Sequence, residues 1–239
     1  TMAATAPPRA DLPRWAETLR QKYLAGEAST FVLYRNVFDN FLVSGKLHGL
    51  QSFLIEELFK DTKKRVVEVS LERGIRHLSG KPNVALAALS QDSGLEPSLL
   101  QSLHVLEAQM RSEQSTAVIV PYADALLPAG DPSFMAQQDR QTYLAFHRWS
   151  LDASLTQGDN ITILITESLG AINPGLLSNP KVSAIEIPMP DLAQRKRVIA
   201  FFAPKLSERQ VTLFSERTGG LRTVQLASIM ASSDGHGLS

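Results

Sequence analysis

The sequence predicts an α/β fold in which a parallel β-sheet carries helices on both faces. Runs of β-branched and aromatic residues alternate with segments of helical periodicity, as in repeated strand–helix units. The run Thr116–Val120 is continuously apolar, as is usual for a central strand that is covered on both faces. A strand over Val182–Ile187 ends at residues 188–191 (PMPD), because proline cannot donate to a sheet ladder. Asp191 with Gln194 then gives the signature of a helix start.

Each predicted element follows from local periodicity and composition. Five strands are predicted, at 29–35, Arg65–Ser70, Thr116–Val120, 160–166 and Val182–Ile187. Helices are predicted at 12–25, 47–59, 86–91, 97–113 with Pro97 as the first residue, 133–155, Leu192–Phe202, 207–217 and from Thr223 onward. Residues 36–45 are predicted to form a loop or an extension of the first strand, and residues 71–81 an irregular basic stretch.

The composition is that of an ordinary globular chain. Hydrophobic residues make up 44% and charged residues 20% of the 239 positions, and the formal net charge is +0, so no global attraction to nucleic acid or membrane is expected. No apolar run approaches the roughly 20 residues that a membrane helix needs, and there is no signal-peptide pattern. Cysteine is absent and the histidines are scattered, which excludes disulfides and argues against a metal site. A cytoplasmic protein that binds neither membrane nor nucleic acid is expected.

Segments in the last third of the chain carry a family resemblance. Residues 173–177 (NPGLL), residues 185–191 (IEIPMPD) and Arg195 resemble, in order and spacing, the end of the large subdomain of AAA+ ATPases. Residues 214–221 (FSERTGGL) look like the start of the helical lid that follows this subdomain in the family. The resemblance covers residues 29–230 and is specific over about the last 60 of them, whereas before them it is only topological.

The resemblance implies a P-loop NTPase-like three-layer sandwich with a five-stranded parallel sheet in the order 5-1-4-3-2, plus a partial helical lid. The expected domain organisation is a disordered lead-in at 1–9, an AAA+-like α/β domain at 10–203, the start of the helical lid at 204–231 and a tail at 232–239. It also implies ATP with Mg²⁺ as the cofactor, and the chain itself or other AAA+ domains, in a ring or in tandem, as partners.

The phosphate-binding loop of the family, G-x-x-x-x-G-K-S/T, has a degenerate counterpart after the first predicted strand. In residues 40–47 (NFLVSGKL), Gly45 and Lys46 keep their places. Asn40 stands at the first glycine, and Leu47 stands at the hydroxyl that would hold Mg²⁺. The resemblance makes Gly45 and Lys46 the nucleotide-binding residues. The favoured alternative is that Gly45 is a turn glycine and Lys46 a surface lysine.

The catalytic positions of the family are also altered. Pro121 stands where the family has the Asp that orients Mg²⁺, and Asp124 follows slightly later, so a turn or cap role is the favoured alternative for it. Thr166 occupies the sensor position at the tip of the fourth strand, with Glu167 next to it, and a threonine there can equally satisfy a strand-end backbone group. Lys181 stands where the family has an arginine finger that reaches a neighbouring subunit, so it keeps the charge but not the forked geometry.

These losses together predict a degenerate AAA+ ATPase-like module that does not hydrolyse ATP alone. Its expected role is oligomer assembly or regulation of an active ATPase domain, with a protein client as a further partner. One alternative is a diverged ATP-binding ATPase of the remodelling or chaperone type, which uses Lys46 and the altered catalytic residues. A second alternative is a clamp-loader-like DNA-transaction subunit that contacts DNA through Arg73 and Arg76, and the neutral net charge argues against it.

Overall fold

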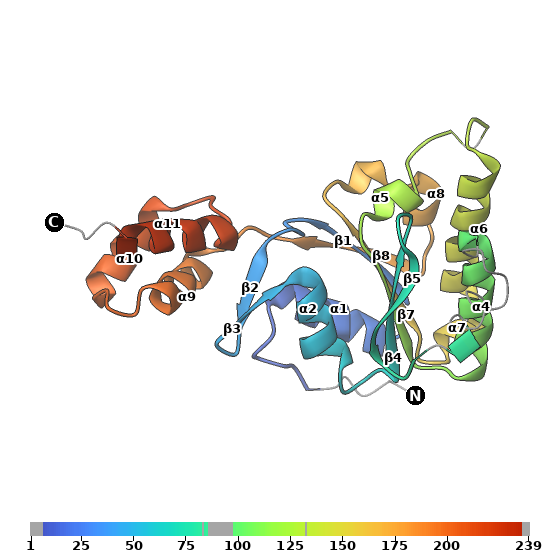
Figure 1. Cartoon of the computed structure of the whole chain (residues 1–239), viewed down its shortest axis with the longest axis horizontal. Helices are drawn as coiled ribbons and strands as arrows, with labels where there is room; N and C mark the ends of the chain where they lie inside the picture. The colour runs from blue at the N-terminus through green and yellow to red at the C-terminus, as the bar shows by residue number, and fades with distance from the viewer. Residues whose placement is uncertain (1–6, 83, 86–97, 132, 236–239) are drawn as a thin grey trace.

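The computed structural model describes residues 7–82, 84–85, 98–131 and 133–235 of the chain. A sheet of six strands runs through it in the order β5-β4-β6-β7-β1-β8 (Figure 1). The strands of this sheet are β1 (Thr30–Arg35), β4 (Arg65–Ser70), β5 (Gly74–Gly80), β6 (Thr116–Val120), β7 (Ile161–Thr166) and β8 (Val182–Ile187). A separate two-stranded sheet contains β2 (Asn40–Val43) and β3 (Lys46–Gly49). Neighbouring strands of the main sheet are parallel, except that β4 and β5 are antiparallel.

The main sheet confirms the predicted strand order and adds a sixth strand. The five predicted strands lie in the order 5-1-4-3-2, and β5 extends the sheet beyond β4. The five predicted strands are parallel to one another, and the added strand β5 is antiparallel to β4. The prediction of an irregular stretch at 71–81 is wrong, because residues 74–80 form this strand. Arg76 and His77 of β5 are exposed. An edge strand with exposed polar side chains lacks the hydrophobic pattern from which a strand is predicted.

Helices cover both faces of the main sheet and complete the predicted three-layer sandwich. α1 and α2 lie on one face, and α4 and α6 lie on the other (Figure 1). The helical segments are α1 (Arg14–Leu24), α2 (Leu50–Phe53) continued by the π-helical η1 (Leu54–Phe59), α4 (Leu99–Ser112), α5 (Ala123–Leu126), α6 (Gln137–Leu151), α7 (Ala153–Thr156), the 3₁₀ turn η2 (Leu169–Ala171), α8 (Pro174–Leu177), α9 (Leu192–Phe202), α10 (Glu208–Arg217) and α11 (Thr223–Gly235).

The hydrophobic core is built by side chains that alternate across the strands. In β1, Phe31 and Leu33 pack on the face covered by α1 and α2, whereas Val32 packs on the other face. Trp15 of α1 and Phe146 of α6 are buried on these two opposite faces. Because both faces are covered, every residue of β4, β6 and β7 is buried, which explains the largely apolar runs of β6 and β7.

The hairpin of β2 and β3 follows β1 and is not predicted by the sequence. The two residues between its strands, Ser44 and Gly45, have positive φ angles of 51° and 74°. Positive φ at both central residues is what a type I′ hairpin turn requires. Phe41 of β2 packs against Trp15 with 5.6 Å between the ring centroids. The bulky residues in the place of the phosphate-binding loop therefore contribute to the core.

Two predicted helices differ from the structure at their boundaries. The helix predicted at 47–59 begins at Leu50, because the residues before it belong to β3. The helix predicted at 133–155 is divided at Asp152, whose side chain accepts a hydrogen bond from the N–H of Ser154 at 2.9 Å and so caps α7. A polar residue that can cap a second helix thus ends the first.

The helix predicted from Pro97 also starts later in the structure. α4 begins at Leu99, and Ser98 forms a capping box with Gln101. The capping box satisfies backbone N–H groups that the helix leaves unpaired, which fixes the start. Pro97 and the helix predicted at 86–91 lie outside the described residues.

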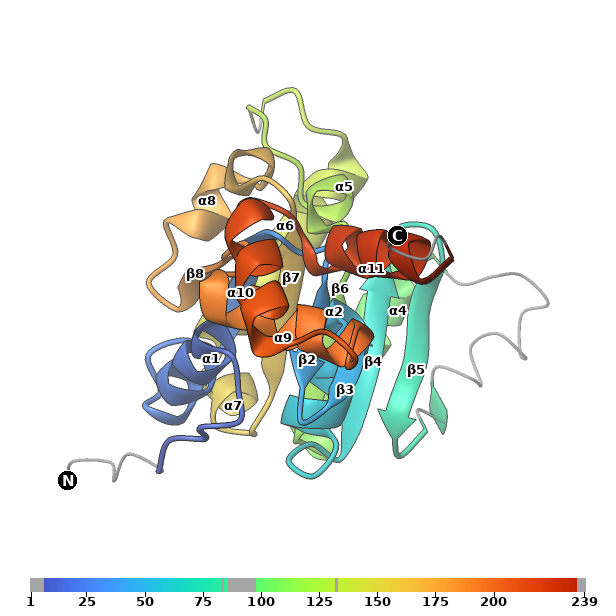
Figure 2. The same ribbon diagram turned by 90° about the vertical axis from the view of Figure 1, so that its left-hand side faces the viewer.

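Helices α9, α10 and α11 pack together as a helical unit (residues 192–235) at one end of the molecule, and Figure 2 views the molecule from this end (Figures 1 and 2). The predicted helix start at Asp191 with Gln194 is confirmed as a capping box of α9, and Ser207 with Gln210 forms another capping box at the start of α10. α9 packs with both α10 and α11, so the helical unit is defined from the start of α9, and the domain boundary at residue 204 stays a prediction. The remaining described residues, up to 191, are called the α/β domain below. No helix among the described residues is long and apolar enough to cross a membrane.

Candidate functional site

A cleft of about 500 Å³ opens at the carboxyl ends of the strands. Ligands of parallel α/β sheets bind at this edge. The cleft is lined by the segment after β1, the start of α2, the hairpin of β4 and β5, and the residues that follow β6. It is therefore the candidate site.

The predicted nucleotide-binding residues Gly45 and Lys46 lie at the tip of the β2–β3 hairpin. The ammonium group of Lys46 forms an ion pair with Glu56 of η1, and the lysine side chain is 64% exposed. Neither Gly45 nor Lys46 lines the cleft. The geometry is that of a hairpin turn beside a surface ion pair, which is the alternative that the sequence favours.

Two predicted catalytic residues, Asp124 and Thr166, come together beside the cleft. The buried hydroxyl of Thr166, at the end of β7, donates a hydrogen bond to the carboxylate of Asp124 in α5 at 3.1 Å. The same hydroxyl oxygen lies 3.2 Å from the carbonyl oxygen of Ser168. The pair thus joins the end of β7 to α5.

The third predicted catalytic residue, Glu167, faces the helical unit. Its carboxylate lies 4.0 Å from the guanidinium group of Arg222, which directly precedes α11. Its carbonyl oxygen accepts a hydrogen bond from the N–H of Arg35 at 3.2 Å. Glu167 therefore contributes an ion pair between the α/β domain and the helical unit.

The chain leaves β6 through a left-handed backbone conformation. Pro121 follows the strand, and Tyr122 has φ and ψ angles of 50°. Such a conformation costs a non-glycine residue about 1–2 kcal/mol, and it is found most often at functional sites. Tyr122 is 61% exposed, its ring centroid lies 5.6 Å from that of Phe38, and both residues line the cleft. The cleft therefore carries an aromatic pair next to the position where the resemblance places a metal-binding Asp.

An ion pair also lines the cleft. Glu68 of β4 is buried and accepts hydrogen bonds from Arg76 of β5 at 2.9 and 3.0 Å and from Gln51 at 2.7 Å. Burial alone would raise the pKa of Glu68, but the hydrogen bonds from Arg76 and Gln51 outweigh it and hold the pKa below its ordinary value. Arg76 is thereby engaged within the chain, which weakens the case for DNA contact through Arg73 and Arg76.

Lys181, the predicted counterpart of the arginine finger, lies just before β8, at the edge of the sheet opposite the cleft. Its ammonium group donates a hydrogen bond to the carbonyl oxygen of Gly26 at 2.9 Å. Its carbonyl oxygen accepts hydrogen bonds from the N–H groups of Ser29 and Thr30. These bonds tie the start of β8 to the turn after α1, and a role of Lys181 at the interface with a neighbouring subunit stays a prediction.

The residues at the carboxyl edge do not fit Mg²⁺ and ATP. A phosphate-binding loop offers backbone N–H groups and a lysine to the phosphates, whereas Lys46 is paired at the tip of the hairpin. The cleft is lined by three carboxylates, of Asp39, Glu68 and Glu72, and by two cations, Arg73 and Arg76. Arg76 is already paired with Glu68, so a triphosphate would meet more carboxylates than free cations there. Within the part of the chain that the structure describes, no group of three or more His, Asp or Glu residues is arranged to hold a metal ion.

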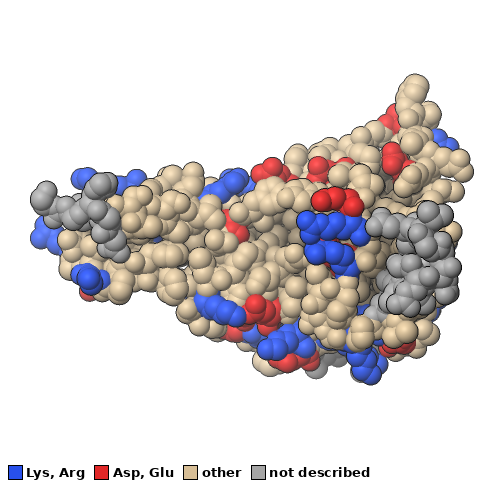
Figure 3. Space-filling model, viewed as in Figure 1, with Lys and Arg blue, Asp and Glu red and all other residues tan. Residues whose placement is uncertain are grey.

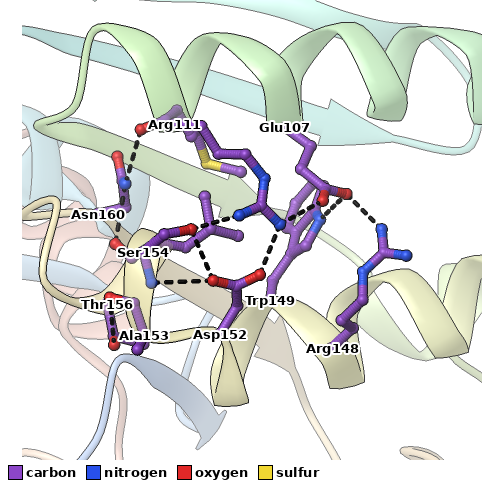
Figure 4. A network of polar contacts seen from close by, with 11 residues as sticks. Glu107, Arg111, Arg148, Trp149, Asp152, Ala153, Ser154, Thr156 and Asn160 are labelled. Atoms are coloured by element: carbon purple, nitrogen blue, oxygen red, sulfur yellow. Dashed lines mark hydrogen bonds and ion pairs between the residues drawn. The ribbon is translucent and has the colours of Figure 1, made fainter.

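A second polar cluster lies between α4 and α6 and does not line the cleft (Figure 4). Glu107 accepts hydrogen bonds from Arg111 at 2.8 Å, from the indole N–H of Trp149 at 2.8 Å and from Arg148. Burial would raise the pKa of this carboxyl, but the bonds from Arg111, Trp149 and Arg148 outweigh it and hold the pKa below its ordinary value. Asp152 also accepts from Arg111, at 2.5 Å. The cluster joins α4 to α6 and to the start of α7, which is a structural role.

A third polar cluster lies at the amino ends of the strands. The buried ammonium group of Lys63 donates to the hydroxyl of Tyr23 and to the carbonyl oxygen of Asp159, each at 2.8 Å. The carboxylate of Asp159 accepts from Tyr23 at 2.6 Å and from Ser115 at 2.7 Å. Burial lowers the pKa of Lys63 even though Asp159 acts in the opposite direction. These bonds join α1 to the segments before β4, β6 and β7, so this cluster is structural as well.

Four residues are not predicted by the sequence: Phe38, Asp39 and Tyr122, which line the cleft, and Arg222, which pairs with Glu167. Asp39 is buried, and its carboxylate is bonded to a backbone N–H 184 residues later, which no local pattern reveals. Proline followed by tyrosine directly after an apolar strand is the one local signal, because it marks the chain reversal that exposes Tyr122.

The chain is similar to known proteins in sequence and in fold. The family described as "AAA+ chaperone, N-terminal Rossmann-like domain" matches residues 5–188. No curated protein matches the chain significantly. A chain in the solved structure of an E. coli MS115-1 HORMA:CdnC:Trip13 complex has a TM-score of 0.58 and 14% sequence identity, over 92% of this chain and 72% of that chain. At this level of identity the similarity is one of fold.

Proposed function

Because the chain belongs to the AAA+ chaperone N-terminal Rossmann-like domain family, we propose that it is an AAA+ ATPase-like module that does not hydrolyse ATP alone. Its role in this proposal is contact with other proteins, either assembly with further AAA+ domains or regulation of an active ATPase domain. The observation that carries the proposal is the β2–β3 hairpin, which stands between β1 and α2, where a phosphate-binding loop would be.

Further observations support the loss of catalysis. Lys46 is paired with Glu56, and Pro121 stands where a metal-binding Asp is expected. Catalysis of phosphoryl transfer depends on positioning and on charge stabilisation by such groups, so their combined loss removes the main contributions to rate. A protein partner is favoured over DNA, because the net charge is +0 and Arg76 is already bound to Glu68.

Isothermal titration calorimetry of the whole chain with ATP, with and without Mg²⁺, tests the proposal. The expected result is no binding heat and no phosphate release above the blank, because nothing described at the cleft replaces the phosphate-binding loop. The variant Lys46→Ala is expected to behave as the unchanged chain does. Lys60→Ala, which removes an exposed lysine elsewhere on the α/β domain, is the matched control.

A diverged ATPase is the second candidate, and the hydrogen bond between Thr166 and Asp124 favours it, because two residues of the predicted catalytic set meet beside the cleft. This candidate requires Mg²⁺-dependent binding heat that Lys46→Ala abolishes and Lys60→Ala retains. It also requires turnover that Thr166→Val abolishes. Either result would overturn the proposal of a module without ATPase activity.

A further inference from the structure

α11 has no N-terminal cap of its own. α4, α9 and α10 each begin with a complete capping box, in which a Ser or Asp side chain accepts a backbone N–H of the first turn. Arg222 directly precedes α11, and a guanidinium group has donors but no acceptor. The side chain of Gln225 accepts the N–H of Arg222 at 2.9 Å, which is only half of a capping box. The N–H groups of Thr223 and Val224 therefore need acceptors from elsewhere.

Asp39 supplies both acceptors from the α/β domain. One carboxylate oxygen accepts the N–H of Thr223 at 2.9 Å, and the other accepts the N–H of Val224 at 3.0 Å. The two oxygens also accept from the side chain of Asn36 and from the N–H of Asn40, each at 2.9 Å. Asp39 is 2% exposed, so its charge is removed from water and is compensated by these four donors.

This carboxylate lies at the junction of the two parts of the molecule. It precedes β2 in the α/β domain, whereas α11 belongs to the helical unit. The side chain of Asn36 that orients it also lies 3.4 Å from the carbonyl oxygen of Pro188, in the connection from β8 to α9. A cavity of about 80 Å³ beside it is lined from both sides, by Trp15 and Asp39 of the α/β domain and by Val198 and Thr223 of the helical unit.

We propose that Asp39 is a latch, which caps α11 across the junction and thereby holds the helical unit in one orientation on the α/β domain. A helix N-terminus attracts an anion through its unpaired N–H groups and its dipole. In this chain the anion is a side chain of the segment after β1. If the helical unit turned away, α11 would lose the acceptors of two N–H groups, and Asp39 would lose two of its four donors. The orientation of the helical unit thus depends on the conformation of residues 36–40.

Distance measurements between two spin labels test the latch. The chain has no cysteine, so Gln138→Cys in α6 and Arg209→Cys in α10 would give two unique labels at exposed positions. Pulsed electron–electron double resonance is expected to give one narrow distance distribution for the labelled chain. Asp39→Ala is expected to replace it with a broad one, and added acetate is expected to restore the narrow distribution, because acetate can return a carboxylate to the space left by the side chain.

Two further variants separate the latch from a general loss of stability. Thr223→Pro removes one of the two N–H donors, at the first position of a helix, where proline is well tolerated, and it is expected to broaden the distribution as Asp39→Ala does. Asp191→Ala removes a capping carboxylate within the capping box of α9, and it is expected to leave the distribution narrow. A narrow, unchanged distribution in folded Asp39→Ala or in Thr223→Pro would overturn the proposal.

Discussion

Glu107 is the residue whose carboxylate has the most charged neighbours in the cluster between α4 and α6. Arg111 and Arg148 both donate to it, and the indole of Trp149 supplies a neutral donor (Figure 4). Its side chain is 11% exposed, so water screens these interactions only partly. The ionised form is therefore favoured in the folded chain, which makes folding stability depend on pH through this residue.

Replacing Glu107 with Gln is expected to lower the free energy of unfolding by about 1–3 kcal/mol at neutral pH, because hydrogen bonds to a charged group are lost. The pKa of Glu107 is lower in the folded chain than in the unfolded chain. Its contribution is therefore fully present above the unfolded value of about 4.3 and disappears as the pH falls through the folded value.

Urea unfolding followed by circular dichroism at neutral and at acidic pH would measure the difference between the two chains. The difference is expected to shrink on acidification. Glu216→Gln, at an exposed position of α10, is the control and should change stability little at either pH. A difference between the Glu107 variant and the unchanged chain that stays constant with pH would contradict the assignment.

At the level of single site residues, the sequence predicts what depends on strand order and misses what depends on turns. Thr166 ends β7 and Asp124 lies in α5 just after the neighbouring strand β6, and the two residues do come within hydrogen-bonding distance. Gly45 and Lys46 have the spacing of a phosphate-binding loop, but the pair of positive φ angles at Ser44 and Gly45 makes this segment a hairpin turn. A glycine is demanded equally by both structures, so its presence cannot distinguish them.

The strand β5 begins and ends at a glycine, and the two glycines differ in how closely other atoms approach them. Gly74 and Gly80 stand at its two ends, with φ angles of +64° and +79°. A Cβ at Gly80 would lie 2.2 Å from the carbonyl oxygen of Lys64 and 2.9 Å from the Cα of Arg65, whereas a Cβ at Gly74 meets nothing within 4 Å. Both positions require a positive φ angle, but only at Gly80 would a Cβ atom clash with neighbouring backbone atoms.

Gly80→Ala is expected to destabilise the fold by about 3 kcal/mol or more, because the new methyl group overlaps the backbone of β4. Gly74→Ala carries only the cost of a left-handed alanine, about 1 kcal/mol. Chemical unfolding of both variants measures this difference. Equal losses of stability would show that β5 yields to the added methyl group, contrary to the expectation.

Helices and strands are predicted well where their signals are local. The capping box of α9 lies within four consecutive residues, Asp191 to Gln194, and its predicted position is confirmed. The extent of β5 could not be predicted, because an edge strand is fixed by its hydrogen bonds to β4 and carries exposed polar side chains. The break between α6 and α7 could not be predicted, because an Asp can either continue a helix or cap the next one. Asp152 caps α7 and thereby ends α6.

On the scale of the whole molecule, a net charge of +0 hides an uneven distribution. The helical unit, residues 192–235, contains seven Lys and Arg but three Asp and Glu, whereas the whole chain has 24 of each kind. The rest of the chain is therefore acidic. Figure 3 shows blue side chains spread over the helical unit, and a mixture of red and blue over the α/β domain.

If the proposed assembly joins the helical unit of one copy to the α/β domain of the next, salt should weaken it, because opposite charges attract and are screened beyond about 8 Å at physiological ionic strength. Analytical ultracentrifugation over a salt series measures this dependence. Arg209→Glu on the helical unit should weaken association, whereas Lys60→Glu on the α/β domain should not. Association that is independent of salt would exclude this arrangement.

The carboxylate of Asp39 at the start of α11 has a consequence for how the molecule responds to its surroundings. A diffusing anion occupies a site in proportion to its concentration, whereas a group attached to the chain is present at an effective concentration of millimolar or above and cannot leave. The N–H groups at the start of α11 are thus bound by Asp39 whatever the concentration of free phosphate or nucleotide. In an assembly with subunits that change conformation as they bind and release a ligand, this chain would keep the same orientation of its helical unit throughout.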